Sequence, residues 1–163
     1  MKVTFEKNNL SGNQATIHTL RKMRVLVNKY KKHPAFFQIS PKIFFEIDGR
    51  DFERLFKKIY DFVLNTIRYQ KDVFNIEVIK SPIRTLEQRF GDCDDMSILI
   101  MALGEFLGYQ SRGVLVSNRK DRKFHHVFAQ LRGSEIWYTL DPVEKVFTNK
   151  KIPLPGITAI MWE

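Results

Sequence analysis

The sequence predicts an α+β fold with helices first and strands afterwards. Before Gly108, apolar residues recur at three- and four-residue intervals, the period of a helix with one buried face. After Gly108 this period gives way to short β-rich runs separated by turn formers. The chain has 163 residues, 44% of them hydrophobic, which is enough for a single domain over 1–163 with a real core.

The sequence predicts the secondary structure of the N-terminal segments with unequal clarity. Residues 1–14 are rich in turn formers and are expected to be loose. A helix is expected over 16–33, with apolar positions spaced for one face and Pro34 marking its end. The run "AFFQISPKIFFEIDG" is apolar but broken by Pro41, so it fits a helix or an extended segment equally well.

A second helix is predicted over 51–68, where seven apolar residues follow a helical period. The connection after it contains Thr85 and Gln88, spaced as a capping box that starts a helical turn at Thr85. A third helix is predicted from Cys93, with Asp92 as its N-cap and Gly108 just past its end. Its nearly unbroken apolar sequence predicts burial on most sides.

Three β-rich runs follow, "SRGVLVS", "HHVFAQLRG" and "EIWYTLDP", and they predict an antiparallel meander. Residues 151–163 can add one more strand. The sheet and the helix that starts at Cys93 would then share one core.

Cys93 is the single cysteine of the chain, and it falls at a helix N-terminus, where unpaired N–H groups favour the thiolate. Asp94 and Asp95 oppose ionisation unless they are paired or point elsewhere. His125 and His126 alternate on one strand, and Asp141 closes the next strand. Thiol, base and orienting carboxylate could therefore meet. Taken one at a time, such a cysteine is more often a small buried residue, and such a histidine is more often structural.

The motifs "GDCDD", "HHVFAQL" and "WYTLDPV" resemble, in this order, the cysteine, histidine and aspartate motifs of the transglutaminase-like superfamily. The run "SPIRTLEQRFGDCDDMSILIMALGEFLGY" is especially similar to small transglutaminase-like proteins of bacteriophages and prophages. The specific part of the resemblance covers 81–143, which would be the catalytic core.

The resemblance implies a papain-like arrangement with Cys93 as nucleophile, His126 as general base and acid, and Asp141 as the carboxylate that orients His126. His126 is preferred to His125 because Val127 and Phe128 follow it in the family's manner. Gln88 would donate to the oxyanion through its side-chain amide, or serve only in the capping box.

Asp92, Asp94 and Asp95 leave three interpretations open. They could cap the helix, pair with Arg84 and Arg89, or bind calcium as some similar bacterial cysteine proteinases do. We assign no metal and no cofactor from the sequence.

Charge is concentrated in the basic arm, residues 1–34, which carry +7 of the total +9. We expect a solvated helix face there, and we do not expect nucleic-acid binding, because no nucleic-acid motif accompanies the charge. Neither a signal peptide nor a membrane span is expected, and the single cysteine suits a reducing compartment. A cytoplasmic protein or a component of a phage particle is therefore anticipated.

The sequence thus predicts a cysteine hydrolase that attacks amide bonds of a protein or peptide through a thioester acyl-enzyme. A protease or deamidase is favoured over a cross-linking enzyme, because no feature selects an amine over water. The alternative is a non-catalytic structural or binding module of phage or prophage origin that keeps the fold, with phage structural proteins as expected partners.

Overall fold

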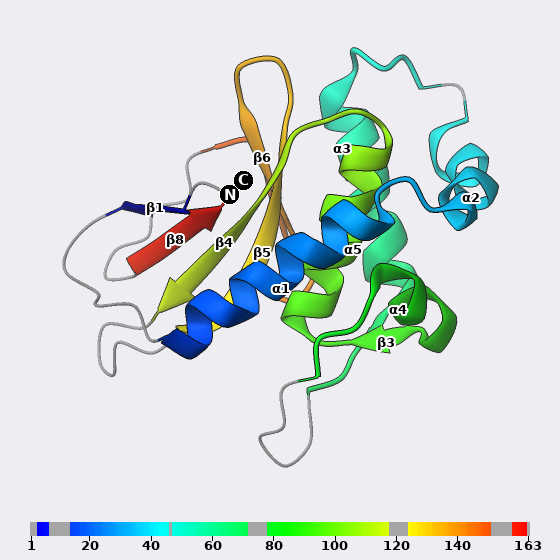
Figure 1. The fold of residues 1–163 in the computed structure, drawn as a ribbon. Helices are drawn as coiled ribbons and strands as arrows, with labels where there is room; N and C mark the ends of the chain where they lie inside the picture. Colours follow the sequence, from blue (N-terminus) through cyan, green and yellow to red (C-terminus); the bar gives the residue numbers. More distant parts are fainter. Residues whose placement is uncertain are drawn as a thin grey trace.

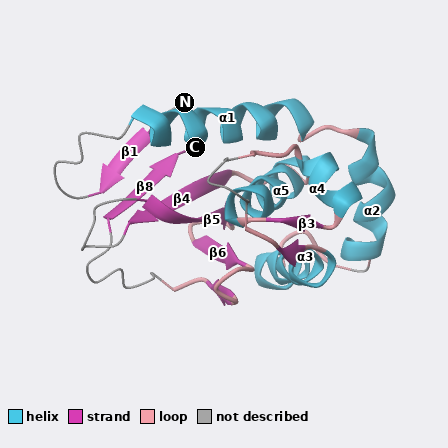
Figure 2. Cartoon of the chain, turned by 90° about the horizontal axis from the view of Figure 1, so that it is seen from below, coloured by secondary structure: helices cyan, strands magenta, loops and turns pink. Residues whose placement is uncertain are grey.

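The computed structural model describes residues 3–6, 14–45, 47–71, 78–117, 124–150 and 158–162. They form an α+β fold in which a six-stranded antiparallel sheet has its helices gathered on one side (Figures 1 and 2). Helix α5 (Cys93–Phe106) packs on strand β5 (Phe124–Arg132) and also contacts the other four described helices, so it is the centre of the core.

Helix α1 (Gln14–Tyr30) places Leu20, Met23 and Val27 in the core, as their spacing predicts. Helix α1 ends at Tyr30, before the predicted end at residue 33, and Pro34 begins helix α2 (Pro34–Phe44), because proline at the first helical position needs no hydrogen-bond donor. The ambiguous run after Pro34 is therefore mostly helical, even though Pro41 lies inside it.

Helix α3 (Phe52–Thr66) confirms the prediction for 51–68. Asp51 is its N-cap and accepts a hydrogen bond from the Arg54 amide. Its inward face is apolar and fully or nearly fully buried, and is formed by Leu55, Phe56, Ile59, Tyr60 and Val63.

Helix α4 (Pro82–Gln88) starts earlier than predicted. Its N-cap is Ser81, whose hydroxyl accepts from the Arg84 amide at 3.2 Å, and Pro82 occupies the first helical position. The expected capping box at Thr85 is therefore wrong: Thr85 lies inside the helix, and its hydroxyl donates to the Ser81 carbonyl. Ser81 and Thr85 are both suitable N-caps. The sequence favours Thr85 because Gln88 follows it by three residues, the spacing of a capping box.

Helix α5 begins and ends where the sequence predicts. Asp92 caps it, and Gly108 follows its end with a φ of +89°, a left-handed conformation that suits glycine. The Tyr109 amide bonds to the Gly104 carbonyl and the Gly108 amide to that of Glu105, which is the Schellman pattern.

The sheet runs in the order β1-β8-β4-β5-β6-β7, where β1 is Val3–Glu6 and β8 is Thr158–Trp162. The predicted meander is confirmed as β4 (Ser111–Ser117), β5 and β6 (Trp137–Asp141), and β7 (Val146–Thr148) extends it. A separate parallel pair joins β2 (Arg68–Tyr69) to β3 (Phe90–Gly91), directly before α5.

Of the two expectations for the chain ends, the first needs correction and the second is confirmed. Residues 1–14 are not loose throughout, because Val3–Glu6 forms β1 and pairs with β8 (Thr158–Trp162). The additional strand expected within 151–163 is β8, and it lies between β1 and β4. Residues 7–13 and 151–157 are outside the described part of the chain. Among the described helices, none is long and apolar enough to cross a membrane.

Candidate active site

Cys93 is the first residue of α5, at the point where the helix leaves β3. The helix can start there because Asp92 and Asp95 form a reciprocal capping box: each side chain accepts a hydrogen bond from the other residue's amide. Local sequence chemistry therefore fixes the cysteine at a helix N-terminus, as predicted.

The Cys93 sulfur lies against the main chain of β5, where it interacts with the Val127 backbone amide, and it also interacts with the Asp94 amide. Ser97, one turn along α5, ties the two elements together by donating to the carbonyl oxygens of Cys93 at 2.6 Å and Val127 at 3.3 Å. Cys93 thus contacts Val127, which is the residue directly after His126 on β5.

Burial raises the pKa of the Cys93 thiol to about 12, because desolvation penalises the thiolate and Asp94 and Asp92 add negative charge nearby. The backbone amides of Val127 and Asp94 oppose this shift but do not cancel it. In the resting arrangement the thiol is therefore protonated at neutral pH. The helix N-terminus alone does not produce a free thiolate here.

His126 and Asp141 form a tight pair, with His126 Nε2 at 2.6 Å from Asp141 Oδ2. In the β5–β6 register, Ala129 faces Leu140, so Asp141 and His126 are diagonal neighbours across the two strands. Their side chains are 17% and 6% exposed. The contact uses Nε2, so Nδ1 is the ring nitrogen that could exchange a proton with another group.

A β-bulge lies directly beside His126. Val116 of β4 pairs with His126, whereas the next residue, Ser117, pairs with Phe124, so His125 is the extra residue. A bulge interrupts the strict alternation of side chains along a strand and re-aims its neighbours. The sequence predicts the strand but not this irregularity. The His125 side chain is outside what the structure describes.

Asp141 is held by the turn that follows it. Its Oδ1 accepts hydrogen bonds from the amides of Val143 (3.2 Å) and Glu144 (3.1 Å), while Oδ2 faces His126. Both carboxylate oxygens are thus engaged, and the buried group is oriented toward the imidazole. This is the arrangement expected of a residue that fixes a base.

Gln88 is the last residue of α4, and its side chain is partly buried. It does not cap a helix that starts at Thr85, because α4 has already begun at Pro82. Among the described residues, no hydrogen bond to its buried Oε1 is found.

The three carboxylates around Cys93 are close together: one ligand atom each of Asp92, Asp94 and Asp95 lie within 4.8 Å of one another. Both oxygens of Asp95 are already bonded, Oδ1 to the Lys80 amide and Oδ2 to the Lys80 ammonium, each at 2.7 Å. Asp95 therefore pairs with Lys80 rather than with Arg84 or Arg89. A calcium ion, which takes six to eight oxygen ligands, does not fit a cluster that already holds an ammonium group.

Sequence reasoning missed two residues around the start of α5. Lys80 is one, since nothing in its sequence context marks a buried lysine. Tyr69 is the other: it pairs with Gly91 across β2 and β3, it is 48% exposed, and burial together with the charges of Cys93 and Asp92 raises its pKa. A short strand directly after an amphipathic helix is the only sequence signal for Tyr69.

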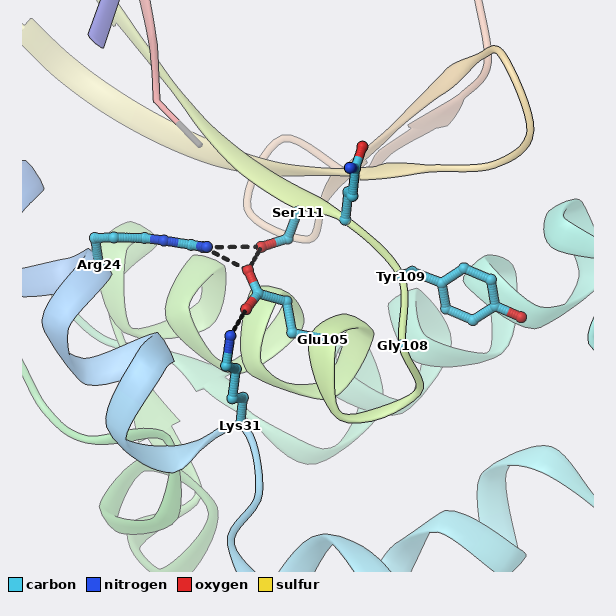
Figure 3. A pocket seen from close by; sticks show the side chains of 7 residues that line it. Arg24, Lys31, Glu105, Gly108, Tyr109 and Ser111 are labelled. Atoms are coloured by element: carbon cyan, nitrogen blue, oxygen red, sulfur yellow. Dashed lines mark hydrogen bonds and ion pairs between the residues drawn. The ribbon is translucent and has the colours of Figure 1, made fainter. Parts of the chain in front are cut away.

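A pocket of about 360 Å³ lies at the opposite end of α5. Figure 3 shows Arg24 of α1 and Lys31, the residue that follows α1, converging on Glu105, with Ser111 beside them. Arg24 and Lys31 each form an ion pair with Glu105, whose side chain is 8% exposed. Glu105 therefore joins α1 and the residue after it to the end of α5. The arrangement accounts for part of the basic arm.

The family model for the transglutaminase-like superfamily matches residues 48–142, more than half of the chain. The chain therefore belongs to the transglutaminase-like superfamily. This match spans α3 through β6 and so includes Cys93, His126 and Asp141. No curated protein matches the sequence.

Solved structures with this fold include a candidate cysteine protease from Cytophaga hutchinsonii (TM-score 0.58, 18% identity, 85% of this chain and 45% of that one). A candidate protease from Parabacteroides distasonis has a TM-score of 0.62 at 8% identity, over 86% of this chain and 35% of that one. Calcium-bound LapG from Legionella pneumophila has a TM-score of 0.58 at 17% identity, over 86% and 81%. The chain thus spans less than half of the first two proteins.

Proposed function

We propose that the protein is a cysteine hydrolase that cleaves amide bonds of a protein or peptide, with Cys93, His126 and Asp141 as its catalytic residues. The observation that carries the proposal is the 2.6 Å contact between His126 Nε2 and Asp141 Oδ2. Beside this pair, the Cys93 sulfur interacts with the backbone amide of Val127. Thiol, imidazole and carboxylate on one helix end and two adjacent strands are the parts that nucleophilic catalysis needs.

The raised thiol pKa sets the order of the steps. Because the resting thiol is protonated, His126 Nδ1 accepts its proton as the sulfur attacks the amide carbonyl. Asp141 stabilises the imidazolium that forms. The tetrahedral oxyanion receives hydrogen bonds from the Cys93 amide and the Gln88 side-chain amide.

The imidazolium then donates its proton to the leaving amine, and the C–N bond breaks to leave a thioester on Cys93. Water attacks this thioester while His126 accepts a proton, and the acid product leaves as the thiol is restored. An amine in place of water would give a new amide by the same steps.

The test is acylation by p-nitrophenyl acetate, which needs no knowledge of the natural substrate. We expect a burst of p-nitrophenol equal to the enzyme concentration, with the acetyl group on Cys93, and no burst in Cys93→Ala or His126→Ala. His18→Ala, which removes an exposed histidine of α1, is the matched control and should keep the burst. The proposal fails if the wild type gives no burst or if Cys93→Ala retains it.

One observation favours a second function. A buried, protonated thiol is also what a binding module with an idle cysteine would show. Such a module would have kept the fold, with phage structural proteins as partners. Absence of the burst, in a protein that unfolds cooperatively, would favour this function over the hydrolase.

A further inference from the structure

Lys80 is a buried cation that pairs with Asp95 in the first turn of the helix that begins at Cys93. Its side chain is 8% exposed and that of Asp95 is 0% exposed, yet the ammonium and the carboxylate meet at 2.7 Å. The ammonium also lies 4.9 Å from the centre of the Phe90 ring, a favourable cation–π position. A lysine is almost never buried to this extent unless a partner compensates its charge.

The pairing is made at two points. The Lys80 backbone amide donates to Asp95 Oδ1 and the ammonium donates to Asp95 Oδ2, so Lys80 forms a hydrogen bond with each oxygen of the carboxylate. Asp95 Oδ2 also accepts from the Asp92 amide in the capping box that starts α5. Lys80 is therefore connected, through one carboxylate, to the backbone that presents Cys93.

Burial raises the pKa of Asp95, and the hydrogen bonds and charge of Lys80 act in the opposite direction. Without the ammonium, three carboxylates would crowd the start of α5 with no compensating charge from this lysine. A divalent cation could supply that charge, but its place on Asp95 is already taken.

We propose that the Lys80 ammonium is the built-in cation of the Asp92–Asp94–Asp95 cluster, so that the thiol site works without a divalent metal. Lys80 is then a positioning residue: it neutralises Asp95 and holds the capping box, and it does not touch the substrate. This inference rests on the proposed function only in taking Cys93 as the nucleophile.

The first experiment titrates calcium chloride into the wild type by calorimetry, and measures iodoacetamide labelling of Cys93 in EGTA and in calcium. We expect no saturable binding up to about 1 mM calcium, a range that includes weak extracellular sites, and equal labelling rates. Saturable binding that is lost in Asp95→Asn, or labelling that depends on calcium, would overturn the proposal.

The second experiment compares Lys80→Gln with Lys80→Arg, which keeps a positive charge. We expect Lys80→Gln to label Cys93 more slowly and to regain labelling when millimolar calcium is added, whereas Lys80→Arg behaves like the wild type. Leu103→Ala, a core variant of the same helix, controls for lower stability and should show no calcium response. A Lys80→Gln protein with wild-type labelling and no calcium response would contradict the proposal.

If Lys80→Gln does not fold, the wild-type titration still decides the question. The outcome is also separable from the proposed function. If labelling is independent of calcium and is also unchanged in His126→Ala, the proposal for Lys80 is supported and the proposed hydrolase is contradicted.

Discussion

Asp92 caps the helix that begins at Cys93 and at the same time places a negative charge beside the thiol. The first role stabilises the helix start, and the second contributes to the raised thiol pKa. The two roles can be separated, because asparagine is as good an N-cap as aspartate but carries no charge.

Asp92→Asn should therefore label faster with iodoacetamide at pH 8, since the thiol pKa falls when a nearby negative charge is removed. A change of one pKa unit corresponds to about tenfold in thiolate fraction, so we expect a rise of up to about tenfold. Stability to urea should change little. The control is Asp61→Asn, which removes a charge from α3. Unchanged or slower labelling in Asp92→Asn would show that its charge does not act on Cys93.

At the residue scale, the sequence predicts where Cys93, Asp92 and Asp141 lie in their elements, because local rules place them: an N-cap precedes a helix, and an Asp-Pro ends a strand. Lys80 is not predictable in this way. Its partner, Asp95, lies fifteen positions away across a separate helix, and only the folded chain joins them. The bulge at His125 is equally invisible, since a run of β-forming residues does not reveal a local change of register.

The central element is α5, and its close approach to β5 depends on Gly104. A Cβ at this position would lie 2.4 Å from Leu131 Cδ2, and the Leu131 side chain is fully buried. Glycine in a helix interior costs about 1 kcal/mol relative to alanine. The packing of the helix on the sheet is the compensating gain.

Gly104→Ala should destabilise the protein by about 1–2 kcal/mol, because overpacking outweighs the better helix propensity. In a Leu131→Ala background the same change should be neutral or stabilising, since the clash is gone. Urea unfolding of the four proteins in this double-mutant cycle is the measurement. A stabilising Gly104→Ala in the wild-type background would show that the contact is loose.

Over the whole molecule, Glu105 joins the basic arm to the core. Burial disfavours its ionisation, but hydrogen bonds from Ser111, Lys31 and Arg24 outweigh burial and hold its pKa below the usual value. A lowered folded-state pKa stabilises the protein above the unfolded pKa, and this contribution is lost as the pH falls through the folded value.

Glu105→Gln should cost about 1–3 kcal/mol at pH 7, as expected for hydrogen bonds to a buried charged group. The difference from the wild type should shrink below about pH 4.3, the ordinary pKa of glutamate. Urea unfolding at pH 7 and at lower pH measures both. Glu135→Gln, at an exposed carboxylate, is the matched control. A difference that stays constant with pH would contradict the assigned pKa direction.

The fold class and the meander are predictable from the sequence because both follow from short-range periodicity. The position of β8 is not: its insertion between β1 and β4 depends on long-range pairing, which composition and period do not encode. The same holds for β1, whose residues gain a regular conformation by pairing with the far end of the chain.

The measurement that tests the central claim most directly is the rate at which iodoacetamide labels Cys93 between pH 5 and 9. It should be made in wild type, His126→Ala, Asp141→Asn and the control His18→Ala. If His126 is the base for Cys93, its loss should slow labelling by on the order of 10²-fold. Asp141→Asn should slow it less, and His18→Ala not at all. Superimposable rates in the wild type and His126→Ala would mean that Cys93 and His126 do not act together.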